Sequence, residues 1–458
     1  MRGGNAPETP GELHSTATNQ TARMSAQQFA VSAAGLAAAA RKPVILIALW
    51  LTVLCMAVRL GVKMEQRKTH FDFSIYYVQS IEVNRGLNPY TTSFNRIAAP
   101  LHFEHFWVDH STEPPPFLVA TIPLAWFSLN KAYWTWNAVN LIALLASLFL
   151  LLGRRSGLDT RVALALAAIA LLYAPVANHF YFGNHKAIIL LMFVLMMRCM
   201  ESSWDGTAGI ILGVAGLLRA FPLGLLGYFL LRRQWKTVKY TVATCAIGGV
   251  ITIAILGIGD TLGFLRGLTT LNGSAYLAIE KNIAIGATAS RAFWAVFGHH
   301  PRALAELVRS LLAWGADIAV LWLAVKATLG IAPGRDRDWR VFSLWIPLSV
   351  IISPSAWPYD LILMLLPFAQ MAGAVTRNDV SRRALWMGGL SYVAAFVANF
   401  AMYTSMPFFL RRDVFLVLVE FWSVSMILAY MSAYWFAADR LSAPVIQFAE
   451  DAPTAVRI

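Results

Sequence analysis

Charged side chains are scarce in this sequence, and they lie mostly between long apolar runs. Only 13% of the 458 residues are charged, while 58% are hydrophobic. Soluble domains carry about 25% charged residues. Apolar runs of about 20 residues, long enough to cross a bilayer as helices, recur along the chain. These runs are continuous, whereas the strands of a membrane β-barrel alternate apolar and polar residues. The sequence therefore predicts an all-α polytopic membrane protein.

Cysteines are also few. The three of them, Cys55, Cys199 and Cys245, all lie within apolar runs and show no paired spacing. This pattern gives no indication of a disulfide framework or of a zinc site.

Acidic residues are fewer than basic ones, 24 against 37, which gives a net charge of +13. In a soluble protein this excess would suggest a nucleic-acid partner. Here the basic clusters are short and are separated by apolar runs, so loops retained in the cytoplasm explain the excess better. We expect no nucleic-acid binding.

Internal repeats, low-complexity segments and a separate soluble domain are not evident either, and three regions follow from composition. Residues 1–43 are polar and then alanine-rich, which predicts a disordered cytoplasmic tail. The first apolar run, about residues 43–62, is too long for a signal-peptide core and is interpreted as an uncleaved span. A membrane domain is expected over residues 44–440, followed by a second cytoplasmic tail over 441–458.

A first extracytoplasmic loop is predicted over residues 63–130. Phe73, Tyr76 and Tyr77 begin a near-helical apolar spacing, which suggests a short amphipathic helix on the membrane surface. The next apolar stretch, residues 114–129, is short and has proline at both ends. If it does not cross, the following span carries Arg154 and Arg155 into the cytoplasm, as the positive-inside rule favours. We therefore expect an interfacial or re-entrant helix there.

This choice fixes the rest of the topology. Residues 207–231 contain Arg219 and Pro222 in the middle, which predicts two half-helices joined in a hairpin. A second external region is expected over 259–301. With the later spans we predict about ten to twelve crossings and two cytoplasmic termini. The later spans are expected near residues 303–327, 341–353, 358–374, 384–403 and 414–436.

Candidate functional residues gather on the predicted outer side. Asp72 follows the first span, where a carboxylate can serve as a general base or simply cap a helix. Arg219 sits in an apolar stretch of about 25 residues, so it requires an anion or a buried acid, two alternatives that remain open. Lys186 begins a span and follows the same logic, with snorkelling as its alternative.

Two aromatic or histidine-rich segments complete the candidates. The segment HFEHFWVDH, residues 102–110, contains side chains of the kind that bind metals but matches no strong template, so an aromatic interfacial loop is the better interpretation. Trp357 and Tyr359 open a late span either as interfacial anchors or as a platform for a sugar. Asp360, just inside that span, is harder to explain structurally.

Four motifs, in this order, resemble glycosyltransferase family 87 of the GT-C superfamily. An external Asp72 leads an aromatic helix that ends at Gly86, Pro89 and Tyr90; a proline-rich start appears as EPPPFLVATIPLAW; a glycine-rich hairpin appears as AGIILGVAGLLRAFP; and a late span opens with Ser353, Pro354 and Trp357. The resemblance covers about residues 44–440. The chain departs from the family pattern at Lys186, at Asn282-Ile283-Ala284 and at Tyr359, where asparagine, an N-Q-S-like motif and histidine are usual.

The resemblance implies a GT-C-like bundle with interfacial helices in the first loop, in a bacterial inner membrane. It implies an inverting transferase that moves mannose or arabinofuranose from a polyprenyl-phosphate donor to a glycolipid or cell-envelope glycan on the extracytoplasmic face. Asp72 would be the general base, and no cofactor is expected. By the same resemblance, the cations near the donor phosphate would be Arg219, Lys186 and Arg291, and the substrate contacts would come from Tyr76, Tyr77, His185, Asn282, Trp357, Tyr359 and Asp360.

Two rival interpretations remain open at this point. A transporter or flippase of a lipid-linked or anionic substrate would also use buried arginines and broken helices, although it should show repeats. A non-catalytic assembly partner that keeps the fold would explain the altered motifs.

Overall fold

The computed structural model describes most of the chain between the two terminal regions. The described stretches are residues 38–67, 72–101, 110–153, 157–271, 281–298, 303–377, 379–403 and 412–438. A few isolated positions are described as well, some of them within 102–109 and 272–280. The predicted tails fall largely outside these stretches, as do His102, Glu104, His105 and Asp109 of the histidine-rich segment.

Within these stretches the chain is helical and contains no strand. The longest helices are α2 (Pro43–Arg67), α6 (Leu129–Leu152), α12 (Trp235–Leu256), α16 (Ala303–Gly330), α19 (Arg382–Tyr403) and α20 (Arg412–Ala438). Shorter α-helices are α3 (Asp72–Asn84), α4 (Phe94–Ala98), α5 (Pro115–Thr121), α7 (Thr160–Leu171), α8 (Ala174–Phe182), α9 (Lys186–Glu201), α10 (Asp205–Leu218), α11 (Leu226–Leu231), α13 (Ile258–Leu271), α15 (Ile285–Phe297), α17 (Arg335–Ile351) and α18 (Leu365–Val375). Four 3₁₀ segments join them: η1 (Ala99–Leu101), η2 (Ile122–Trp126), η4 (Phe221–Leu225) and η5 (Pro358–Met364).

Six helices of the described chain are long and apolar enough to cross a membrane, or seven if α7 and α8, bent by 52°, form one broken span. This confirms an all-α polytopic membrane protein. The expected ten to twelve crossings stay a prediction, because the additional spans would have to come from the shorter or more polar helices, such as α9, α10, α17 and α19.

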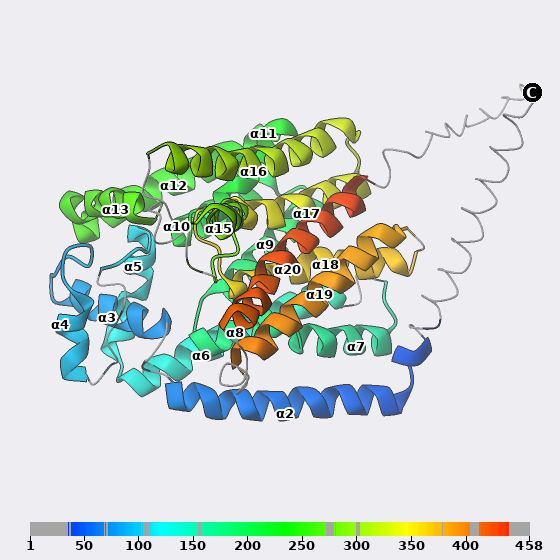
Figure 1. The fold of residues 1–458 in the computed structure, drawn as a ribbon, viewed down its shortest axis with the longest axis horizontal. Coiled ribbons are helices and arrows are strands. Elements are labelled where there is room, and N and C mark those ends of the chain that lie inside the picture. Colours follow the sequence, from blue (N-terminus) through cyan, green and yellow to red (C-terminus); the bar gives the residue numbers. More distant parts are fainter. Residues whose placement is uncertain are drawn as a thin grey trace, which may run out of the picture.

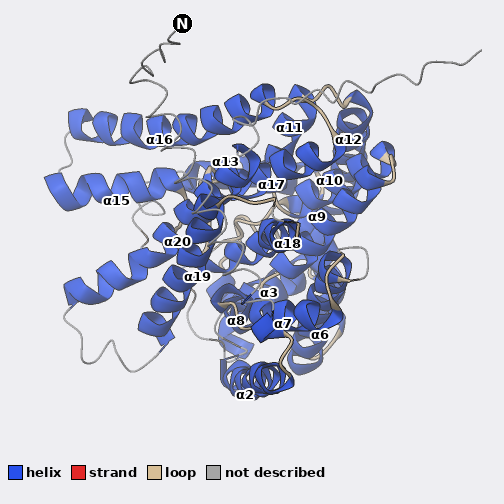
Figure 2. Cartoon of the chain, turned by 90° about the vertical axis from the view of Figure 1, so that its right-hand side faces the viewer, coloured by secondary structure: helices blue, strands red, loops and turns tan. Residues whose placement is uncertain are grey.

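Some of the shorter helices gather at one end of the bundle. In Figure 1, α3, α4, α5 and α13 lie together on the left, while α2 and α16 extend toward the right. Viewed from the side, α2 lies at the bottom and α15 and α16 project from the upper part of the bundle (Figure 2). The cavity described below opens at this end of the bundle.

The segment after the first loop forms α5 and η2, which together cover residues 115–126 and are too short to cross a bilayer by themselves. Proline lies within the first two positions of each piece. The first N–H groups of a helix have no partner within the helix, so the N–H that proline lacks is not missed there. The segment is therefore consistent with the interfacial or re-entrant helix that the charge pattern favours.

The first-loop helix also forms, as α3, but protein covers it. Its buried side chains include polar ones such as Ser74, Gln79 and Glu82, and it packs against α4, α5 and η2. The near-helical apolar spacing correctly predicted a helix; the polar side chains turn inward as well because later segments enclose it.

The predicted break in residues 207–231 is confirmed. Helix α10 ends at Leu218, Arg219 is extended with φ −155° and ψ 136°, and η4 starts with Pro222 near its first position. A Cβ on Gly216 would lie 2.4 Å from Leu223 Cδ2, so the glycine leaves room for the Leu223 side chain where the chain folds back.

Candidate active site

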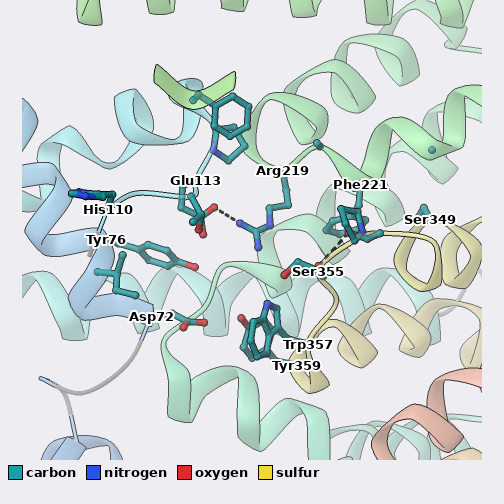
Figure 3. A pocket seen from close by; sticks show the side chains of 18 of the residues that line it. Asp72, Tyr76, His110, Glu113, Arg219, Phe221, Ser349, Ser355, Trp357 and Tyr359 are labelled. Atoms are coloured by element: carbon teal, nitrogen blue, oxygen red, sulfur yellow. Dashed lines mark hydrogen bonds and ion pairs between the residues drawn. The ribbon is translucent and has the colours of Figure 1, made fainter. Parts of the chain in front are cut away.

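A cavity of about 360 Å³ opens among α3, the residues before α5, the α10–η4 break and the loop before η5. Figure 3 shows Asp72, Tyr76, Glu113, Arg219, Trp357 and Tyr359 around it. Aromatic rings form much of the wall and few polar groups converge on the space, which is the usual composition of a small-molecule site. The other lining residues are Ile75, Phe94, His110, Thr112, Pro114, Ala220, Phe221, Gly224, Phe264, Ser349, Ile352, Ser353, Pro354 and Ser355.

Asp72 is the first residue of α3 and is held by two hydrogen bonds. Asn184 Nδ2 donates to Asp72 Oδ2 at 2.7 Å, and the Tyr359 hydroxyl is the second donor. Desolvation of the carboxyl raises the pKa of Asp72 to about 6, although both hydrogen bonds act to lower it. A carboxylate with this pKa is mostly ionised at neutral pH and accepts a proton more readily than an ordinary aspartate.

A tight turn between α8 and α9 brings Asn184 to Asp72. Gly183 ends α8 in the left-handed region, with φ 66° and ψ 36°. A Cβ at this position would lie 2.7 Å from Phe73 Cβ. The glycine thus allows both the turn and the close approach to α3 that the Asn184–Asp72 hydrogen bond needs.

A second layer of polar groups supports this arrangement. Tyr76 lines the cavity, and its hydroxyl accepts from Asn184 Nδ2 at 3.1 Å and lies 3.3 Å from His185 Nδ1. His185 is fully enclosed and lies behind Tyr76. Tyr77 points elsewhere, because its hydroxyl donates to the carbonyl of Phe127 at 2.9 Å. Of these three predicted contacts, only Tyr76 is part of the cavity wall.

Arg219 reaches the cavity from the α10–η4 break and forms an ion pair with Glu113 (Figure 3). Both side chains remain slightly exposed, 18% and 10%, and both residues line the cavity. The acid that Arg219 requires, which the sequence left unidentified, is therefore Glu113. Arg219 also acts electrostatically on Asp72, and so does Glu113 with the opposite sign.

Lys186 does not line the cavity. Its ammonium lies 2.8 Å from Asp360 Oδ1 in an almost fully buried pair and sits over the ring of Phe221, 4.6 Å from the centroid. Asp360 Oδ2 in turn accepts the backbone N–H of Trp357 at 2.7 Å. The pair joins the start of α9 to η5, so the structure places Lys186 beside Asp360 and outside the cavity lining.

Asn282 and Arg291 also lie behind the cavity. Asn282 donates to the carbonyl of Pro354 at 3.0 Å and accepts the N–H of Ala356 at 3.2 Å. Arg291 donates to the Asn282 carbonyl at 2.8 Å and pairs with Glu420 at 2.5 Å. Both residues therefore support the segment that supplies Ser353 and Pro354 to the cavity, and neither lines the cavity itself.

The sequence pointed to Asp72 and Arg219, and the structure places both at the cavity, but the sequence did not identify Glu113 as the partner of Arg219 or Asn184 as the hydrogen-bond donor to Asp72. One feature of the sequence points to each residue. Glu113 precedes the proline run that starts α5, and Asn184 lies two residues before the unusual Lys186. Among the described residues no group of three or more His, Cys, Asp or Glu side chains is placed to hold a metal.

The fold and the cavity define a membrane protein with a poised carboxylate and an arginine at one site. The family model "Glycosyltransferase family 87" matches residues 112–354, more than half of the chain. The chain belongs to glycosyltransferase family 87.

Curated relatives agree with this assignment. A polyprenol-phosphate-mannose-dependent alpha-(1-2)-phosphatidylinositol mannoside mannosyltransferase of Mycolicibacterium smegmatis is 27% identical over 65% of this chain and 68% of its own length. The protein of the same name from Mycobacterium tuberculosis is 25% identical over 61% of this chain and 66% of its own. An alpha-(1->3)-arabinofuranosyltransferase of Corynebacterium glutamicum is 32% identical over 31% of this chain and 35% of its own. No solved structure matches.

Family membership decides between the two main classes left open by the sequence. The protein is a membrane glycosyltransferase, which agrees with the family resemblance. A transporter is not supported.

Proposed function

We propose that the protein is an inverting transferase that moves mannose or arabinofuranose from a polyprenyl-phosphate donor to a glycolipid or cell-envelope glycan. One observation carries this proposal: Asp72 and Arg219, a base and a cation, line one cavity. Two of the relatives are named for their dependence on polyprenol-phosphate-mannose, and the third is named for arabinofuranosyl transfer. These names support a lipid-linked donor for this chain.

In the proposed reaction Asp72 takes the proton of the acceptor hydroxyl as that oxygen attacks the anomeric carbon. The bond from the anomeric carbon to the donor phosphate breaks, and the phosphate leaves with the electron pair. Asn184 and Tyr359 orient the base through their hydrogen bonds. Arg219 stabilises the charge that develops on the leaving phosphate.

The remaining candidates take supporting roles in this proposal. Trp357 and Tyr76 offer aromatic walls to the sugar. Asp360, with Lys186, fixes the loop of Tyr359, and Asn282, with Arg291, holds the same loop from its other side. His185 supports Tyr76.

We further propose an extracytoplasmic site in a bacterial inner membrane, with both termini in the cytoplasm. Helix α12 ends beside α13, at the end of the bundle that holds the cavity. Its start, at the opposite end, is flanked by Arg232, Arg233, Lys236 and Lys239. Because positive residues stay in the cytoplasm, this distribution supports a cavity on the outer side.

The test is sugar transfer by purified protein in nanodiscs, with radiolabelled polyprenyl-phosphate mannose and polyprenyl-phosphate arabinofuranose and extracted envelope glycolipids as acceptors. Asp72→Asn keeps the shape of the side chain and removes the base, so we expect transfer to fall by about 10²–10⁴-fold. Asp205→Asn, in the first turn of α10 and outside the cavity lining, is the matched control and should retain activity.

Equal transfer by the wild type and Asp72→Asn would contradict the assignment of the base. Absence of transfer from both donors, with folded wild-type protein, would contradict the proposed reaction and would favour a non-catalytic partner.

A further inference from the structure

Glu113 is a carboxylate at a place where an anionic ligand is expected. It lines the same cavity as Asp72 and forms the ion pair with Arg219. Two carboxylates and one guanidinium therefore face this cavity. Binding a phosphate requires the cation of Arg219 but not a carboxylate beside it, so Glu113 calls for a separate explanation.

The position of Glu113 is fixed by its backbone. Its N–H donates to Ser111 Oγ at 3.2 Å, and its carbonyl accepts from the hydroxyl of Tyr90 at 2.7 Å. Ser111 Oγ donates in turn to Gln79 of α3 at 2.9 Å. The backbone of Glu113 is thus held by these two contacts, and its carboxylate contacts Arg219, beside the phosphate that Arg219 is proposed to bind.

The two lipid phosphates in the proposed reaction differ in charge. The donor is a phosphodiester with one negative charge, whereas the product is a phosphate monoester with about −1.5 to −2 at pH 7. A cationic site alone binds the more charged product more tightly and is blocked by it. A fixed negative charge beside the cation repels each ligand in proportion to the ligand's charge, so it weakens product binding more than donor binding.

We infer that Glu113 is a specificity-determining counter-charge, which acts through Arg219 to favour the singly charged donor over the more highly charged polyprenyl phosphate product. This inference rests on the proposed function. Glu113 would then set product release, while Asp72 sets the chemical step.

The experiment measures binding and turnover separately in nanodiscs. Wild type, Glu113→Gln and Glu113→Asp are titrated with polyprenyl phosphate and with polyprenyl-phosphate mannose, and product inhibition of transfer is measured in parallel. For Glu113→Gln we expect about tenfold tighter binding of the product but only about threefold tighter binding of the donor, because the repulsion removed scales with ligand charge. Inhibition by added product should strengthen accordingly, and kcat should fall.

Two controls keep the result interpretable. Glu113→Asp retains the charge and should stay near the wild-type ratio of donor to product affinity. Glu306→Gln neutralises the acid of another arginine pair, that of Arg309, outside the cavity lining, and should change neither affinity.

The outcomes separate the two proposals. Equal tightening of both ligands, or no tightening, in a folded Glu113→Gln protein would overturn the role of Glu113 and leave the transferase intact. If the wild type bound neither lipid phosphate, the proposed function itself would fail.

Discussion

Replacing Asn184 by leucine removes the amide that donates to Asp72 at 2.7 Å and leaves a side chain of similar size. A hydrogen bond to a charged group contributes about 1.5 kcal/mol or more, and about 1.4 kcal/mol corresponds to one pKa unit. The bond favours the ionised carboxylate, so its loss should raise the pKa of Asp72 from about 6 to about 7.

The consequence is a shift in the pH dependence of transfer. The base must be ionised, so kcat/KM should rise with pH through the pKa of Asp72 and level off above it. At pH 7 the ionised fraction should fall from about nine-tenths in the wild type to about one half in Asn184→Leu. The acidic limb should therefore move up by about one unit, while activity at pH 8.5 stays closer to that of the wild type.

The assay is a pH–rate profile from pH 5 to 8.5 at low donor concentration. Tyr359→Phe removes the other hydrogen bond to Asp72 and should shift the limb in the same direction. Tyr392→Phe, whose hydroxyl bonds the Ile169 carbonyl, is the matched control. A limb that stays at its wild-type position in Asn184→Leu, or moves to lower pH, would refute the assignment of Asp72 as the titrating base.

Two further predictions concern the framework of the site. Lys186→Met leaves Asp360 buried without its cation and should lower the free energy of unfolding by about 3–5 kcal/mol; Lys186→Met combined with Asp360→Leu should recover much of the thermal stability, and failure to recover it would show that the ion pair is not the cause. Gly183→Ala places a Cβ against Phe73 at a positive φ, so we expect a loss of about 1–2 kcal/mol and reduced transfer, measured by thermal unfolding and by the nanodisc assay; unchanged values in both would contradict a tight turn here.

The sequence predicted the parts of the fold that depend on local properties. Long apolar runs predicted α2, α12 and α16 because each must satisfy its own backbone in lipid. Pro222 marked the break beside Arg219, since proline removes a backbone donor.

The parts that the sequence did not predict depend on pairing between distant segments. Glu113 is 106 positions from Arg219, and Arg291 is 129 from Glu420. Nothing in the sequence near a buried cation identifies its partner, so Arg291 and Lys186 looked like phosphate ligands as much as Arg219 did. Only packing shows that Arg219 alone of the three lines the cavity.

The distribution of the site along the chain has a consequence for biosynthesis. Asp72 leaves the ribosome early, yet its hydrogen-bond donors, Asn184 and Tyr359, arrive much later. The polar side chains that are buried on α3 are also covered only after later segments of the chain have been made. Because chains are made from the N-terminus, a nascent protein that already carries Asp72 and Arg219 still lacks a complete base. In the proposed mechanism the hydrogen-bonded base is therefore complete only when the segment containing Tyr359 has been made and inserted.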